Sequence, residues 1–106
     1  MNIRYELLDK AKQRALPETK EPLPFGQLRT NHMFLMNYKT GDWSDPRIVP
    51  YGEISLRPGA MCMHYGQTIF EGAKAFIHDD GEIYLFRYDK NCERLNHSAR
   101  NLCMPE

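Results

Sequence analysis

The sequence has no excess of charge of either sign and no long apolar run. Its 106 residues include 14 Lys and Arg and 14 Asp and Glu, a formal net charge of zero. Nucleic-acid binding usually needs a net basic surface, so we expect no nucleic acid among the partners. No stretch approaches the roughly 18 apolar residues that cross a bilayer, and the segment Met1–Glu6 lacks an apolar signal core. We therefore expect no membrane contact.

Cysteine is also scarce, with three widely spaced residues and no Cys-x-x-Cys pair. This pattern is typical of reduced thiols in a cytoplasmic protein. Cys62 and His64 are two apart and would share a face of a strand. Two ligands fall short of a zinc set, and a Cys-His nucleophile pair would need a third orienting group. We expect no metal site.

Length and local pattern predict a small α+β protein with a modest core. In residues 2–15 apolar side chains recur at helical spacing, which predicts an amphipathic helix. A charged, Pro-rich linker is expected over 17–24. The domain boundaries expected from this are 1–24 for helix and linker, and 25–106 for a small α+β domain.

The first half of that domain is expected to be extended. The pattern of residues 30–38 predicts a strand. Because apolar residues would lie on both faces of this strand, we expect both faces to be buried. Thr40-Gly41-Asp42 predicts a turn, and the three prolines in 46–58 predict an irregular extended segment. An antiparallel sheet with flanking helices is the expected architecture.

The second half is expected to contain a hairpin and a helix. The runs 73–78 and 83–88 are separated by a segment containing Asp80-Gly81, a strong hairpin signal. Asp89 is then expected to cap a helix over about 90–103.

Arg94 lies within that predicted helix and has two possible roles. On its own it is an ordinary solvent-facing arginine. Alternatively its guanidinium, with five donors and a fixed charge, would suit a phosphate dianion. It stands five residues after Asp89, near the positive end of the helix dipole, and His97 and Ser98 would add donors. These features are compatible with a phosphate without being specific for one.

Two aromatic residues, Tyr65 and Phe70, stand five apart beside Gly66 and Gly72. They would serve either as core packing or as the wall of a pocket for an apolar side chain. Phe25 would be a third aromatic, although alone it reads as an anchor for the linker.

Several blocks in a fixed order resemble the branched-chain aminotransferases, which belong to the fold-type IV pyridoxal-phosphate enzymes. The resemblance covers about Pro24 to Pro105. Its strongest blocks are Asn31-His32-Met33, Pro46 to Tyr51, His64-Tyr65-Gly66-Gln67, Phe70-Glu71-Gly72 with Lys74-Ala75, and Leu85-Phe86-Arg87. The match is extended by Asn91 to Arg94, Ser98-Ala99 and Met104-Pro105.

This resemblance implies the N-terminal small domain of such an enzyme, with pyridoxal 5'-phosphate held between it and a larger domain. It implies that Arg94 binds the cofactor phosphate and that Phe25, Tyr65 and Phe70 line the substrate side-chain pocket. The family's dimeric state implies a homodimer. The Schiff-base lysine would lie beyond Glu106, so Lys74 is not its counterpart and this chain holds no catalytic residue.

The function implied is transfer of the amino group of Leu, Ile or Val to 2-oxoglutarate, in branched-chain amino-acid biosynthesis, with this fragment inactive alone. Two alternatives stay open. One is a D-amino-acid aminotransferase or aminodeoxychorismate lyase of the same fold. The other is a standalone interaction module without enzymatic activity.

Overall fold

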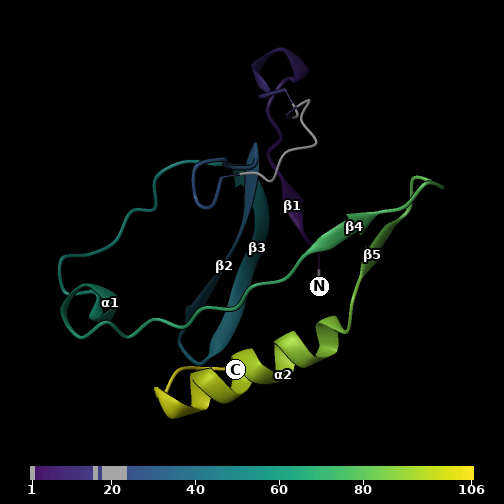
Figure 1. The fold of residues 1–106 in the computed structure, drawn as a ribbon. Helices are drawn as coiled ribbons and strands as arrows, with labels where there is room; N and C mark the ends of the chain where they lie inside the picture. The colour runs from purple at the N-terminus through teal and green to yellow at the C-terminus, as the bar shows by residue number, and fades with distance from the viewer. Residues whose placement is uncertain (1, 16, 18–23) are drawn as a thin grey trace. The chain divides into compact units, whose positions relative to one another are not determined.

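The computed structural model describes residues 2–15, 17 and 24–106, which divide into the units Met1–Ser55 and Leu56–Glu106. The elements of the first unit are β1 (Arg4–Tyr5), the 3-10 helix η1 (Lys10–Lys12), β2 (His32–Lys39) and β3 (Asp42–Pro50). Those of the second are α1 (Met61–His64), β4 (Ala75–Ile77), β5 (Ile83–Leu85) and α2 (Tyr88–Asn101) (Figure 1). This mixture, with two antiparallel hairpins, confirms the α+β class.

The first unit is built on the antiparallel hairpin of β2 and β3, with β1 added in parallel on the far side of β3. Thr40 and Gly41 form its turn with φ of 54° and 88°. The strand and the turn predicted here are therefore confirmed. Burial of β2 on both faces is wrong, because its residues are half-buried or exposed. The short elements described in this unit are too few to cover two faces of a sheet.

Residues 42–50 form one strand with an irregularity at Asp45 and Pro46, so the segment without strand pairing begins only after Pro50. Leu35 pairs with Arg47 and Asn37 with Ser44, which leaves Asp45 and Pro46 as a bulge in β3. Proline has no N–H to donate, and it is tolerated at a bulge because the extra residue there makes no ladder hydrogen bond. Asp45 has a φ of 51°, and its carboxylate accepts from Arg4 at 3.0 Å and Arg47 at 2.9 Å.

The predicted N-terminal helix is wrong. Arg4 and Tyr5 pair with Arg47 and Ile48 of β3, and the Glu6 N–H donates to the Ile48 carbonyl at 2.9 Å. Only the single 3-10 turn of η1 is helical among the described residues of the segment. Backbone partners distant in sequence have overridden a local propensity that is always a weak signal. Most of the expected linker, residues 18–23, lies outside the described residues.

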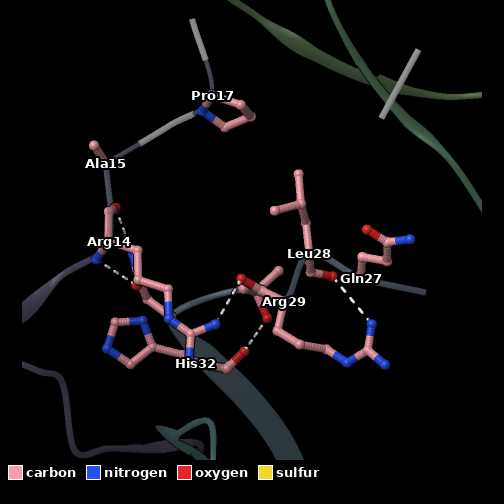
Figure 2. A pocket seen from close by; sticks show the side chains of 9 residues that line it. Arg14, Ala15, Pro17, Gln27, Leu28, Arg29 and His32 are labelled. Atoms are coloured by element: carbon pink, nitrogen blue, oxygen red, sulfur yellow. Dashed lines mark hydrogen bonds between the residues drawn. The ribbon is translucent and has the colours of Figure 1, made fainter. Parts of the chain in front are cut away.

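Two side chains of the resemblance block at the start of β2 hold this N-terminal segment. The Leu8 N–H donates to His32 Nε2 at 2.9 Å, and the Arg14 N–H donates to Asn31 Oδ1 at 2.8 Å. Figure 2 shows Arg14, Arg29 and His32 around the resulting cavity of about 600 Å³. Arg29 binds the Tyr51 hydroxyl at 3.1 Å and the Leu28 carbonyl at 3.2 Å. Asn31 Nδ2 also donates to the Arg14 carbonyl at 3.4 Å, so both side chains bind the chain's own backbone.

The hairpin and the long helix predicted for the second unit are present, but both strands are shorter than predicted, and the helix begins and ends two residues earlier. Ala75 pairs with Leu85 and Ile77 with Ile83 around a turn in which Gly81 has a φ of 83°. The helix begins at Tyr88, and its N-cap is Arg87 with a φ of 46°. Asp89 is therefore a first-turn residue and not the cap, because the left-handed Arg87 starts the helix earlier.

Burial is slight throughout the described residues. Ala99, 2% exposed, is the only buried hydrophobic residue among them. Cys62 and His64 lie in the short helix α1, so the expected strand face for this pair is wrong. None of the helices in the described parts of the chain has the length and apolar character needed to cross a membrane.

Gly41 tests the importance of the β2–β3 turn. Gly41→Ala places a side chain at a φ of 88° and should destabilise the hairpin by about 1–2 kcal/mol. Gly59→Ala is the matched control, because an added Cβ meets open space there without a left-handed backbone. Amide hydrogen exchange of β2 and β3 should accelerate only in the first variant. Equal acceleration in both variants would contradict the conclusion that the positive φ of Gly41 stabilises the hairpin turn.

Candidate functional site

Glu71, in the connection between α1 and β4, is the centre of the densest polar cluster of the second unit. Its side chain is 13% exposed. It accepts from Arg94 Nε at 2.6 Å, from Arg94 Nη2, from Asn91 Nδ2 at 3.1 Å and from the Gly72 N–H at 2.9 Å. Asn91 Nδ2 also donates to the Gly72 carbonyl at 2.7 Å. Three of these donations go to Oε1 and one, from Arg94 Nε, goes to Oε2.

These contacts lower the pKa of Glu71 from 4.5 to about 2. The hydrogen bond from Arg94 has the largest effect. Partial burial acts in the opposite direction, and the Gly72 and Asn91 donors lower the pKa further. The same pairing raises the pKa of the Arg94 guanidinium. Both groups are therefore charged at neutral pH, and the cluster is an ion pair.

Arg94 uses only one edge of its guanidinium in this pair. Nε and Nη2 contact Glu71, whereas Nη1 has no hydrogen bond to the described residues. The Arg94 side chain is 65% exposed. Two N–H groups on Nη1 and one on Nη2 thus remain for a ligand. A planar guanidinium with free parallel donors is suited to a carboxylate or a phosphate.

The arguments from the helix dipole and from the neighbours of Arg94 need correction. Since α2 starts at Tyr88, Arg94 stands in its second turn, and the dipole acts mainly within the first. Ser98 Oγ donates to the Arg94 carbonyl at 3.0 Å, so its proton is already used. His97 is exposed. The case for an anion site therefore depends on the guanidinium itself.

The three aromatic candidates are strongly exposed, at 100% for Phe25, 80% for Tyr65 and 87% for Phe70. Phe25 belongs to the first unit, and the two others belong to the second. The ring contacts found among the described residues do not include Tyr65 or Phe70. Lys74, just before β4, is exposed. The structure thus leaves these rings as surface that another part of a protein or a ligand can cover.

A cavity of about 250 Å³ adjoins the cluster; it is lined by Glu71, Ala73, Tyr88, Asn91, Cys92 and Leu95. It is smaller than the roughly 300–1,000 Å³ of ligand pockets, and Arg94 is absent from its lining. Within the described parts of the chain, His, Cys, Asp and Glu side chains form no group of three that could hold a metal ion. Anion binding at the open edge of Arg94 is the chemistry that this arrangement best supports.

Sequence reasoning missed the roles of Glu71 and Asn91. Asn91 could have been found, because it lies three residues before Arg94 and so shares its helix face. Glu71 is 23 residues from Arg94, and no local spacing connects them.

Comparison with protein-family models found no match. Curated proteins do match. The chain is 49% identical over 98 residues to branched-chain-amino-acid aminotransferase 2 of Bacillus subtilis, covering 86% of this chain and 27% of that protein. Branched-chain-amino-acid transaminase 1 of the same organism is 44% identical over 103 residues, covering 94% and 29%. A branched-chain-amino-acid aminotransferase of Mycobacterium tuberculosis is 47% identical over 83 residues, covering 77% and 23%. The chain thus spans about a quarter of the length of these relatives.

The pKa of Glu71 provides a test of the ion pair. Its carboxyl should titrate at about pH 2, and in Arg94→Ala its pKa should rise toward the ordinary value of 4.5. Because the folded-state pKa is depressed, the stabilisation is complete above about pH 4.5 and is lost as the pH falls toward 2. Carboxyl-carbon NMR titration of the chain measures this. Arg100→Ala is the control, since Arg100 lies on the same helix but pairs with Glu106. An unchanged Glu71 titration in Arg94→Ala would contradict the pairing.

Proposed function

Because the chain belongs to the branched-chain-amino-acid aminotransferase family, of which it is an N-terminal fragment, we propose that the whole protein transfers the amino group of Leu, Ile or Val to 2-oxoglutarate. The relatives' names favour this substrate class over the D-amino-acid aminotransferase and aminodeoxychorismate lyase alternatives. They also favour an enzyme over a standalone interaction module. We further propose a cytoplasmic homodimer acting in branched-chain amino-acid biosynthesis.

One observation supports the cofactor proposal: Arg94 binds Glu71 through Nε and Nη2 and keeps the donors of Nη1 available. Its free donors and fixed positive charge fit the phosphate of pyridoxal 5'-phosphate. When bound, this cofactor supplies the electron-withdrawing ring that stabilises charge on the substrate α-carbon as a proton leaves it. Arg94 would contribute by binding and orienting the phosphate end. The lysine that attaches the cofactor, and the other groups around it, would lie beyond Glu106.

Phe25, Tyr65 and Phe70 would line the pocket for the branched side chain of the substrate. Their exposure supports this role, because a branched aliphatic side chain gains free energy when it covers apolar rings. These rings would also keep water from the reacting end of the substrate. The branched-chain amino acid and the 2-oxo acid formed from it share this side chain, so the same rings would contact both of them.

The fragment alone should be inactive. Incubated with pyridoxal phosphate, leucine and 2-oxoglutarate, residues 1–106 should form no glutamate, whereas the full-length protein should form it readily. The reason is that the attaching lysine and most of the cofactor's contacts are outside this chain. Turnover by the fragment that disappears in Lys74→Ala would overturn this expectation and assign the reaction to Lys74.

Arg94→Ala in the full-length protein should weaken cofactor binding roughly 30- to 1000-fold, the loss of a charge-assisted phosphate contact worth about 2–4 kcal/mol. Arg94→Lys should recover only part, because an ammonium lacks the planar fork. Cofactor titration by absorbance measures both. Arg100→Ala, at an exposed arginine later in α2, is the control and should bind normally. Equal affinities in all variants would remove Arg94 from the site.

A further inference from the structure

We propose that Glu71 is a positioning residue for the phosphate site: it holds Arg94 by Nε and Nη2 and so presents the Nη1 edge to the cofactor. This inference rests on the proposed role of Arg94 as the phosphate ligand. It assigns to Glu71 a function that is distinct from binding the cofactor, because a carboxylate and a phosphate repel each other. Glu71 would act entirely through the guanidinium.

The geometry of the pair supports this assignment. A contact through both Nε and Nη2 fixes the plane of the guanidinium as well as its position, which a contact through one nitrogen would not do. A free arginine side chain loses rotamer entropy when a ligand immobilises it. Here Glu71 has already restricted those rotamers, so the phosphate gains its hydrogen bonds at a smaller entropic cost.

Glu71 is itself the better anchored partner. Its side chain is 13% exposed and Arg94 is 65% exposed. Two further donors, Asn91 Nδ2 and the Gly72 N–H, hold the carboxylate independently of Arg94. Asn91 is in turn bound to the Gly72 carbonyl. The carboxylate therefore lies in a frame made of the chain's own backbone and α2, and Arg94 is oriented against it.

A competing role for Glu71 makes the opposite prediction. If the carboxylate merely occupied Arg94 until a phosphate displaced it, removing its charge would tighten phosphate binding. If it positions Arg94, removing its charge weakens phosphate binding despite the gain in local positive charge. The sign of one measured change therefore separates the two roles.

The experiment compares pyridoxal 5'-phosphate with pyridoxal, which lacks the phosphate, in the full-length protein. The dissociation constant of pyridoxal divided by that of pyridoxal 5'-phosphate is a ratio that isolates the contribution of the phosphate. Glu71→Gln should reduce this ratio by roughly 5- to 30-fold and leave pyridoxal binding unchanged. Glu93→Gln, which removes a 63% exposed carboxylate from α2 itself, is the matched control and should leave the ratio unchanged.

Glu71→Asp covers the case in which Glu71→Gln fails to fold. It keeps the negative charge but shortens the side chain, so the contact to both nitrogens is lost and the ratio should again fall. In the cofactor-free protein the Arg94 Nε–H signal should be sharp and protected from exchange, and either substitution should abolish that protection. This second readout does not depend on activity.

A double substitution tests whether Glu71 works through Arg94. In an Arg94→Lys background, which cannot form the two-nitrogen contact, Glu71→Gln should have little further effect on the ratio. An equal effect in both backgrounds, an unchanged ratio in Glu71→Gln or a tighter phosphate contact would each overturn the positioning role. A ratio insensitive to Arg94→Ala would instead overturn the proposed phosphate ligand, which is a separate result.

Discussion

The hydrogen-bonded carboxylate of Glu71 is the constraint on which the second unit depends. It ties the connection before β4 to the N-terminal half of α2, and Gln67 Nε2 ties the start of the same connection to the Leu102 carbonyl at 2.8 Å. The four residue steps from Gln67 to Glu71 can span up to about 13 Å and the eight steps from Arg94 to Leu102 rise about 12 Å, so the two attachments are compatible in length. Phe70 lies between these two attachments and stays exposed.

The first unit follows the same principle with different groups. The bulge at Asp45 and Pro46 brings a carboxylate to Arg4 and Arg47, and the side chains of Asn31 and His32 bind the backbone of the N-terminal segment. Polar contacts and strand pairing thus organise a chain with very little buried apolar surface. Phe25, Tyr65 and Phe70 remain as exposed apolar surface of the kind that contacts with other surfaces or ligands cover.

The local features of the fold could be predicted because their causes are local. Gly41 and Gly81 supply the positive φ that their turns require, and the apolar spacing around Leu95 and Ala99 suits a helix. Two of the predictions that were wrong concern segments whose structure depends on distant partners or on strand pairing. The N-terminal segment has helical spacing but pairs with β3, and Pro46 has the character of a strand breaker but lies at a bulge.

The same division applies to the candidate site. The sequence by itself determined the α+β class and the resemblance to the family, and it offered Arg94 as a candidate, because a guanidinium and the order of the family blocks are visible in the chain. Only the tertiary structure decided which edge of Arg94 is free, that the helix begins too early for its dipole to matter, and that Glu71 and Asn91 hold the arginine. The physical reason is distance along the chain: an ion pair between residues 71 and 94 exists only once the hairpin and helix between them have folded.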